Sequence, residues 1–253
     1  MTVLEAAVGD AADEYVAAAS AAALHTLGHL KKKPDDLQAR SDLIETYEQR
    51  MVPPSSPGND LYSKLRSVPH ARCPLCGQRL VESLDHQLPK KKYPLLAVVP
   101  SNLVPACSTC NWLKGEKEPT TAEEQTLHPY FDDVTGQQWL FARVNESDDG
   151  PPAIVYVVQT PDGWNDVLAA RVQYHVRTFA LKELFGTHAA SEMSNNRSFL
   201  ASMDSKERAA FLARMSDSIA SDKEAGGLNH WRRVMYQTLA GNPWYIEGGY
   251  ARF

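Results

Sequence analysis

The chain has 253 residues, of which 43% are hydrophobic and 23% are charged, a composition typical of one large globular domain or two modest ones. Its formal net charge of -5 excludes a surface that is basic throughout, so a polyanion would have to be bound by a local basic patch. Charged residues interrupt the long apolar stretches, and the alanine-rich start contains acids but no basic leader. We therefore expect neither a membrane span nor export, and a cytoplasmic protein.

The first sixty residues are predicted to form a helical N-terminal region. Between Val3 and Leu30, apolar residues recur at steps of three and four, which is typical of one helix or a helix pair. A further helix is predicted from Pro34 towards Met51. The stretch 52–60 is rich in Pro, Ser and Gly, which break regular structure, so we expect a linker there and a boundary near residue 60.

All four cysteines lie in two Cys-x-x-Cys pairs, Cys73 with Cys76 and Cys107 with Cys110. Four thiolates suit tetrahedral zinc, because the two-residue spacer lets both sulfurs of a pair reach one ion. Buried free cysteines or a redox pair are the alternatives, but a redox motif needs only one Cys-x-x-Cys. The spacing therefore predicts a closed, structural zinc site.

About thirty residues separate the two cysteine pairs, more than the fifteen to twenty of a simple zinc ribbon. The composition of this segment predicts one strand over 79–86 and a second over 95–99. A short helix is predicted after them, capped by Ser108 or Thr109 and stopped by Gly115. The predicted order is strand, strand, helix.

The C-terminal region, residues 131–253, is predicted to be α+β. Residues 137–144 and 153–160 are rich in β-branched and aromatic residues on either side of a polar stretch, which indicates a hairpin. An apolar stripe over 166–185 predicts a helix that Gly186 would end. Further helices are expected near 205–220 and 229–239. This region is interpreted as scaffold or partner surface.

Particular residues of the cysteine-framed segment form a recognisable combination. In chain order they are Cys73-x-x-Cys76, Leu84-Asp85-His86-x-x-Pro89-Lys90, Asn102-Leu103 and Cys107-x-x-Cys110-Asn111-x-x-Lys114-Gly115. In this combination, residues 61–130 resemble the core of the HNH endonucleases, a ββα-metal finger, with a four-cysteine structural zinc. Asn111 stands where many members have a second His, so the chain resembles the HNN-type variant. The fold class expected overall is α+β, with this small core flanked by the two other regions.

The resemblance implies a role for each matching residue. His86 would be the general base that takes a proton from the water attacking phosphorus. Asp85 and Asn111 would hold one catalytic Mg²⁺ or Mn²⁺ ion. Asn102 would hold the loop that orients His86, and Lys114 would touch a phosphate. The products would carry 5′-phosphate and 3′-hydroxyl ends.

Basic residues cluster near this segment. Counting seven cations against Glu82 and Asp85 gives seven minus two, or +5; the seven are Lys64, Arg66, Arg72, Arg79, Lys90, Lys91 and Lys92. We expect this patch, and Lys90 to Lys92 in particular, to contact nucleic acid. The alternative for the three lysines is a solvated turn.

Two further residues, His128 and Asp132, follow the finger and are candidates to join the metal, although packing or capping is the commoner role of such a turn. The remaining histidines have no motif around them and are interpreted as structural; they are His25, His29, His70, His175, His188 and His230.

The function expected from the resemblance is metal-dependent hydrolysis of DNA phosphodiester bonds. A finger that contacts mainly the backbone has little sequence specificity, and the flanks are acidic, so a protein partner such as an ATPase or a target-sensing subunit would choose the target. By analogy, the setting would be a prokaryotic anti-phage or restriction-type system. Two alternatives stay open: a non-catalytic zinc-finger module that binds nucleic acid or protein, and an RNA-directed HNH nuclease.

Overall fold

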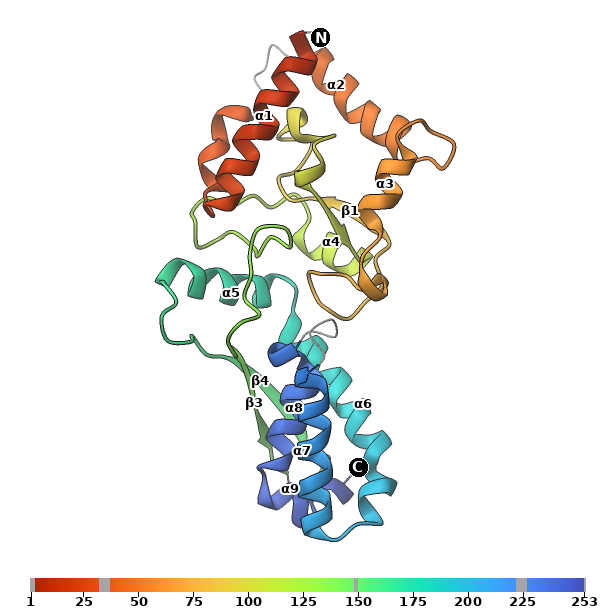
Figure 1. Ribbon diagram of the computed structural model, residues 1–253, viewed down its shortest axis with the longest axis vertical. Helices are drawn as coiled ribbons and strands as arrows, with labels where there is room; N and C mark the ends of the chain where they lie inside the picture. The colour runs from red at the N-terminus through yellow and green to blue at the C-terminus, as the bar shows by residue number, and fades with distance from the viewer. Residues whose placement is uncertain (1–2, 32–36, 148–149, 222–226, 253) are drawn as a thin grey trace. The chain divides into compact units, whose positions relative to one another are not determined.

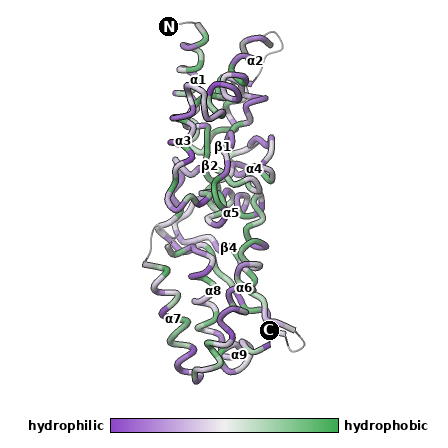
Figure 2. Tube along the Cα trace, turned by 90° about the vertical axis from the view of Figure 1, so that its right-hand side faces the viewer, coloured by the Kyte–Doolittle hydropathy of each residue, from purple (hydrophilic) through white to green (hydrophobic). Residues whose placement is uncertain are grey.

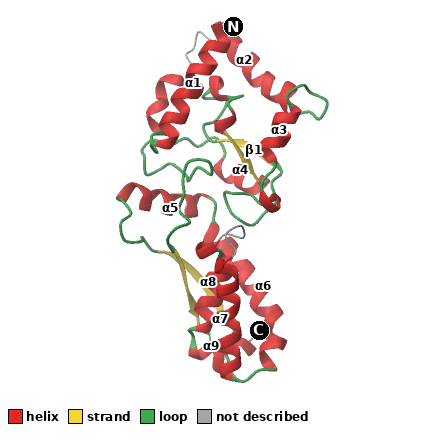
Figure 3. Ribbon diagram, in the orientation of Figure 1, coloured by secondary structure: helices red, strands yellow, loops and turns green. Residues whose placement is uncertain are grey.

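The computed structural model describes residues 3–31, 37–147, 150–221 and 227–252. The chain forms two compact units (Figure 1). Unit 1 comprises Met1–Asp132 and Asp166–Phe179, and unit 2 comprises Asp133–Asn165 and Ala180–Phe253. Helices predominate, and the described residues add two small two-stranded sheets (Figure 3), so the predicted α+β class is confirmed. None of the described helices is long and apolar enough to cross a membrane.

Unit 1 begins with helices that pack onto the cysteine-framed segment. They are α1 (Val3–Ser20), a 3-10 helix (Leu24–Leu30), α2 (Leu37–Glu45), a π-helical turn (Thr46–Met51) and α3 (Asn59–Arg66). The buried face of α1, including Tyr15, joins one core with Leu88 and Leu96. Tyr47 and Tyr62 join a second core with Leu84. The expected start of a helix at Pro34 lies outside the described residues.

The boundary expected near residue 60 does not separate two compact units. Helix α1 shares one core with Leu88 and Leu96, which lie after this boundary, and burying apolar side chains is the main favourable term in folding. The expected linker is an ordered turn, because the Gly58 amide donates to the Arg50 carbonyl at 2.8 Å. A Cβ at Gly58 would lie 2.7 Å from that oxygen, so glycine is required there.

The centre of unit 1 is a strand pair followed by a helix, in the predicted order. Strand β1 (Ser83–His86) pairs antiparallel with β2 (Leu103–Ala106), with His86 opposite Leu103. Helix α4 (Ser108–Lys114) follows directly. In the hydropathy colouring of Figure 2, green hydrophobic residues are conspicuous around this pair, in keeping with the full burial of β2.

Two local predictions for this segment are wrong. The strand expected over 95–99 is absent there, because Pro94 and Pro100 each begin a 3-10 turn and the buried apolar run between them is irregular. A short apolar run indicates burial without distinguishing strand from turn. The helix cap is Cys107, whose Sγ accepts from the Cys110 amide at 3.3 Å, in place of Ser108 or Thr109. Gly115 ends the helix as predicted, with φ of +55°.

The long helix predicted over 166–185 is two helices. Helix α5 (Asp166–Thr178) belongs to unit 1, and α6 (Leu181–Ala201) belongs to unit 2. Ala180, with φ of +49°, interrupts them, and Gly186 lies inside α6 instead of ending a helix. The apolar stripe is continuous in sequence because both helices bury the same kind of face, but they bury it in different cores.

Unit 2 is a hairpin packed against helices. The predicted hairpin is confirmed as β3 (Leu140–Asn145) paired antiparallel with β4 (Ala153–Val158). The helices predicted near 205–220 and 229–239 are confirmed as α7 (Ser205–Ser221) and α8 (Trp231–Ala240), and α9 (Pro243–Glu247) follows. Helix α6 packs on β4 and α8 packs on β3.

Candidate functional site

The four cysteines lie together in unit 1 and can hold a metal ion. All four are buried, and their sulfur atoms lie within 4.8 Å of one another. Backbone amides point at two of the sulfurs, from Arg79 to Cys76 at 3.5 Å and from Cys110 to Cys107 at 3.3 Å. Thiol hydrogen bonds from Cys110 and Cys73 lower the pKa of Cys76, and hydrogen bonds within the cluster raise the pKa of Cys110. A cluster that favours a thiolate is suited to a cation.

Helix α5 braces this cluster from a distant part of the chain. His175 Nε2 donates to the carbonyl of Leu75, inside the first Cys-x-x-Cys turn, at 2.8 Å. Burial lowers the pKa of His175 to about 4, so its ring is neutral near pH 7. Arg171, also buried, binds Asp132 at 2.5 and 2.8 Å and the Gln125 carbonyl at 3.2 Å. His175 therefore has a structural contact, and Arg171 was not singled out by the sequence.

His86 ends β1 with its ring held in one orientation. Its side chain is buried, and Nε2 lies 2.9 Å from the carbonyl oxygen of Ala97. A carbonyl only accepts, so Nε2 carries the hydrogen and Nδ1 keeps the lone pair that can take a proton. Burial lowers the pKa of His86 to about 3. The imidazole is therefore neutral and free to act as an acceptor at neutral pH.

Asn102 fixes the loop that supplies this carbonyl. Its side chain is 0% exposed, and its Oδ1 accepts from the Leu88 amide at 2.7 Å. Its Nδ2 donates to the carbonyls of Leu88 at 3.0 Å and Leu96 at 3.1 Å. The two ends of the loop are thus tied to one side chain, next to the Ala97 carbonyl that meets His86.

Asp85 is buried beside a buried cation. Lys114 Nζ lies 3.0 Å from Asp85 Oδ2 and 3.3 Å from Oδ1, and it donates to the His86 carbonyl at 2.7 Å. The contact to Oδ2 lacks the alignment of a hydrogen bond, so this oxygen accepts none. Burial raises the pKa of Asp85, and Lys114 partly offsets the rise.

The phosphate contact expected of Lys114 does not fit this arrangement. Its side chain is only 4% exposed, and its ammonium group already contacts Asp85 and donates to the His86 carbonyl. The sequence identified a cation near the site, but packing directs its ammonium group towards Asp85 and the backbone of His86.

A pocket of about 240 Å³ brings together the candidate catalytic side chains of Asp85, His86 and Asn111. Asn111 Nδ2 donates to Ser83 Oγ at 3.0 Å, which leaves the amide oxygen as a ligand. Tyr47 also lines the pocket, although it comes from the N-terminal helices. The pocket therefore joins residues from three elements of unit 1.

Three of the seven cations in the basic patch expected around the site are paired with acids. Each of its three consecutive lysines meets a glutamate: Lys90 with Glu48 at 3.0 Å, Lys91 with Glu116 at 2.7 Å and Lys92 with Glu118 at 3.3 Å. Glu118 also pairs with Lys31 at 3.1 Å, so four cations minus three anions gives +1. The sequence count missed these acids because they lie before and after the stretch of residues that was counted.

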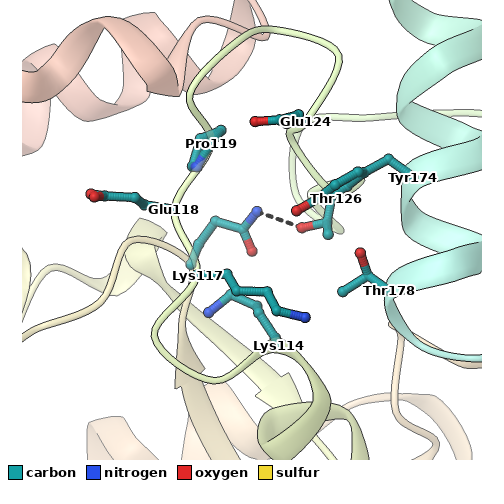
Figure 4. A pocket seen from close by; sticks show the side chains of 9 residues that line it. Lys114, Lys117, Glu118, Pro119, Glu124, Thr126, Tyr174 and Thr178 are labelled. Carbon is teal, nitrogen blue, oxygen red and sulfur yellow. Dashed lines mark hydrogen bonds between the residues drawn. The ribbon is translucent and has the colours of Figure 1, made fainter.

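A second, smaller cavity shares Lys114 with the site (Figure 4). Its volume is about 20 Å³, and Tyr174 and Thr178 of α5 line it. Gln87 and Thr126 also line it, and Gln87 Nε2 donates to Thr126 Oγ1 at 3.0 Å. A space of this size holds a single water molecule and excludes a substrate.

His128 and Asp132 do not line the pocket. His128 is fully buried, its Nε2 lies 2.9 Å from the Tyr15 hydroxyl, and its amide donates to Asp132 at 2.7 Å. Asp132 is paired with Arg171. Both residues hold the turn in place, which is the packing and capping role given as the commoner alternative to joining the metal.

The chain is similar to a phage protein. It is 30% identical over 222 residues to protein ea31 of Escherichia phage lambda, and the alignment covers 81% of this chain and 74% of ea31. The chain therefore belongs to the ea31 family. No established family profile matches it, and no solved structure matches it.

Proposed function

We propose that the chain is a metal-dependent endonuclease of the HNH type that hydrolyses DNA phosphodiester bonds. The observation that carries the proposal is the convergence of Asp85, His86 and Asn111 in one pocket, with the His86 ring fixed by the Ala97 carbonyl. This is a base, a carboxylate and an amide oxygen at the end of a strand pair, beside a four-cysteine cluster.

In this proposal His86 is the general base. Its Nδ1 takes a proton from a water molecule as that water attacks phosphorus. The burial that keeps the ring neutral leaves the lone pair available, and the negative charge of a bound phosphodiester would favour the imidazolium that forms. Asn102 keeps the Ala97 carbonyl in place, so the base does not turn away during the step.

Asp85 and Asn111 would hold the catalytic Mg²⁺ or Mn²⁺ ion. A buried carboxylate oxygen that accepts no hydrogen bond, together with one amide oxygen, fits a hard cation that retains several waters. When bound, such an ion neutralises charge on the phosphoryl group and stabilises the departing 3′ oxygen. We propose zinc for the cysteine cluster, where the donors are four thiolates and no position remains for chemistry.

The acids that pair with the three lysines at the rim support dependence on a partner. Non-specific affinity for DNA comes mainly from cations that neutralise phosphates, and here the three lysines already have acidic partners. We propose that a protein such as an ATPase or a target-sensing subunit brings the nuclease to its target, in the cytoplasm of a prokaryote, as part of an anti-phage or restriction-type system. The sequence similarity to a phage protein supports a role during phage infection of bacteria.

The test is a cleavage assay with purified protein on supercoiled plasmid, linear DNA and RNA, each with Mg²⁺, Mn²⁺ or EDTA. We expect metal-dependent nicking of plasmid that is lost in His86→Ala and retained in His29→Ala, which removes an exposed histidine outside the pocket. Equal cutting by wild type and His86→Ala, or no cutting even with proteins encoded by neighbouring genes, would reject the proposal. Cutting of RNA alone would make the chain an RNA-directed nuclease.

One observation favours a second candidate, a non-catalytic zinc module. Lys114 neutralises Asp85, and a carboxylate so paired has less charge to offer a cation. A module of this kind would contain zinc, bind nucleic acid or protein, and show no cleavage under any metal condition. The same assay separates the two candidates.

A further inference from the structure

We infer that Tyr47, in the N-terminal helices and outside the cysteine-framed segment, is a positioning residue that holds the His86 imidazole in the pocket. The inference rests on the proposed function, in which His86 is the base. It extends the site beyond residues 61–130, to which the HNH resemblance is limited.

The His86 ring needs a second constraint besides its hydrogen bond to Ala97. The hydrogen bond from Nε2 to the Ala97 carbonyl fixes one atom of the ring, and the ring can still pivot about that contact. For Nδ1 to meet an attacking water, the plane of the ring must be fixed as well. A displacement of about 1 Å at a reacting group can lower a rate on the order of a hundredfold.

Tyr47 supplies the second constraint. Its ring centroid lies 4.5 Å from that of His86, at an interplanar angle of 72°, the edge-to-face geometry that aromatic pairs favour. Both rings line the same pocket and both are buried.

Tyr47 is itself held from several directions. Its hydroxyl donates to the Leu84 carbonyl at 3.3 Å, two residues before His86 on the same strand. Tyr62 packs edge-on against it, with centroids 6.4 Å apart. It also lies on the π-helical turn Thr46–Met51, a rare conformation that is frequent at functional sites. A side chain held in this way can restrain the ring that it contacts.

The same ring organises the rim of the pocket. Lys90 Nζ lies 4.5 Å from the Tyr47 ring centroid, within the range of a cation–π contact, and is also paired with Glu48 on the same turn. Tyr47 thereby contacts both the proposed base and a cation at the mouth of the pocket. Losing the ring should disturb both.

The experiment compares Tyr47→Phe, which keeps the ring, with Tyr47→Leu, which removes it. Met51→Ala is the matched control, because it removes apolar volume from the same buried cluster and the same turn without lining the pocket. Each variant is measured for free energy of unfolding, for single-turnover cleavage of plasmid with Mn²⁺, and for the His86 tautomer by ¹⁵N nuclear magnetic resonance.

We expect Tyr47→Phe to retain the wild-type rate within about threefold, with one His86 tautomer. We expect Tyr47→Leu to lose on the order of tenfold to a hundredfold in rate and to show averaged His86 nitrogen signals. Met51→Ala should retain both readouts despite its lost stability. The inference is overturned if Tyr47→Leu keeps its rate and a single tautomer, or if Met51→Ala loses as much.

These outcomes are separable from failure of the proposed function. If wild-type protein does not cut, the nuclease proposal fails, and the nitrogen spectra alone decide whether Tyr47 holds His86. A fixed tautomer in wild type and Tyr47→Phe, lost only in Tyr47→Leu, would sustain the positioning role. Identical spectra in all four proteins would reject it.

Discussion

Asp85 and Lys114 form a pair of opposite charges that are both almost completely withdrawn from water. Their side chains are 7% and 4% exposed, far below the exposure of the lysine and glutamate pairs at the rim. A buried pair contributes little net stability, but removing one partner leaves an uncompensated buried charge. Removing one partner should therefore cost more stability than removing both.

We predict that Lys114→Met lowers the free energy of unfolding by about 3 to 5 kcal/mol, and that adding Asp85→Asn restores part of the loss. Denaturant unfolding of the single and double variants measures the coupling. Lys117→Met is the control, since Lys117 is exposed and should change stability by less than about 0.5 kcal/mol. If Lys114→Met left stability unchanged and weakened DNA binding instead, Lys114 would be a phosphate contact after all.

At the scale of elements, α5 joins the cysteine cluster through one buried histidine. His175 meets the Leu75 carbonyl, and its pKa of about 4 lies below the ordinary value of 6.5 because the charged form is poorly solvated. The unfolded chain therefore binds a proton at a higher pH than the folded chain does. The stability that the neutral ring contributes is present above pH 6.5 and is lost as the pH falls from 6.5 towards 4.

We predict that lowering the pH from 7 to 5 costs on the order of 2 kcal/mol through His175. His175→Gln, which can still donate to Leu75 but does not titrate in this range, should show a shallower dependence on pH. Urea unfolding at several pH values measures the difference, with His29→Gln as the exposed control. Protonation of the cysteines affects the wild type and both variants alike, so the comparison is between the slopes of their stability against pH. Parallel curves would contradict the prediction.

The elements also show where local patterns suffice. The β3–β4 hairpin and helices α7 and α8 lie within a few residues of the predicted ranges, because each buries one face of a regular repeat. The run 95–99 and the stripe 166–185 were misassigned. In both segments the apolar residues correctly indicated burial. The backbone conformation was set by two prolines in the first segment and by Ala180 in the second.

At the scale of the whole molecule, the two units have separate cores, and the cysteine cluster lies in only one of them. Two separate stretches of the chain make up unit 1, because α5 belongs to it although α5 follows the β3–β4 hairpin of unit 2 in the sequence. A metal that closes the cysteine cluster should therefore stabilise unit 1 in particular. Binding of a structural metal is coupled directly to the folding of the residues that hold it.

We predict that removing the metal with a chelator, or by Cys107→Ser, abolishes amide protection in unit 1 and leaves the helices of unit 2 protected. Hydrogen exchange read by mass spectrometry resolves the two, and metal content is measured on the same samples. Ser216→Ala, a buried substitution in α7, is the control that should leave unit 1 unchanged. Equal loss of protection in both units would mean that they unfold together.

Local spacing was enough to predict the cysteine cluster, the strand that ends at His86, the short helix that ends at Gly115 and the unit 2 hairpin, but not the second strand of the pair, β2. Each of these depends on spacing between residues that are near one another in the chain, where the reach of the backbone allows few arrangements. The proposed roles of Asp85, His86 and Asn111 come from a resemblance and stay predictions.

Which distant residues meet depends on the packing of the complete fold. Tyr47 reaches His86 across 39 positions, and Arg171 reaches Asp132 across another 39. Glu48 and Glu116 cancel the charge of lysines that a local count had treated as a patch. An apolar or charged pattern indicates that a side chain will be buried or paired, but the partner is chosen by the packing of the whole unit. For that reason the sequence located the candidate site, and the fold determined its walls and its charge.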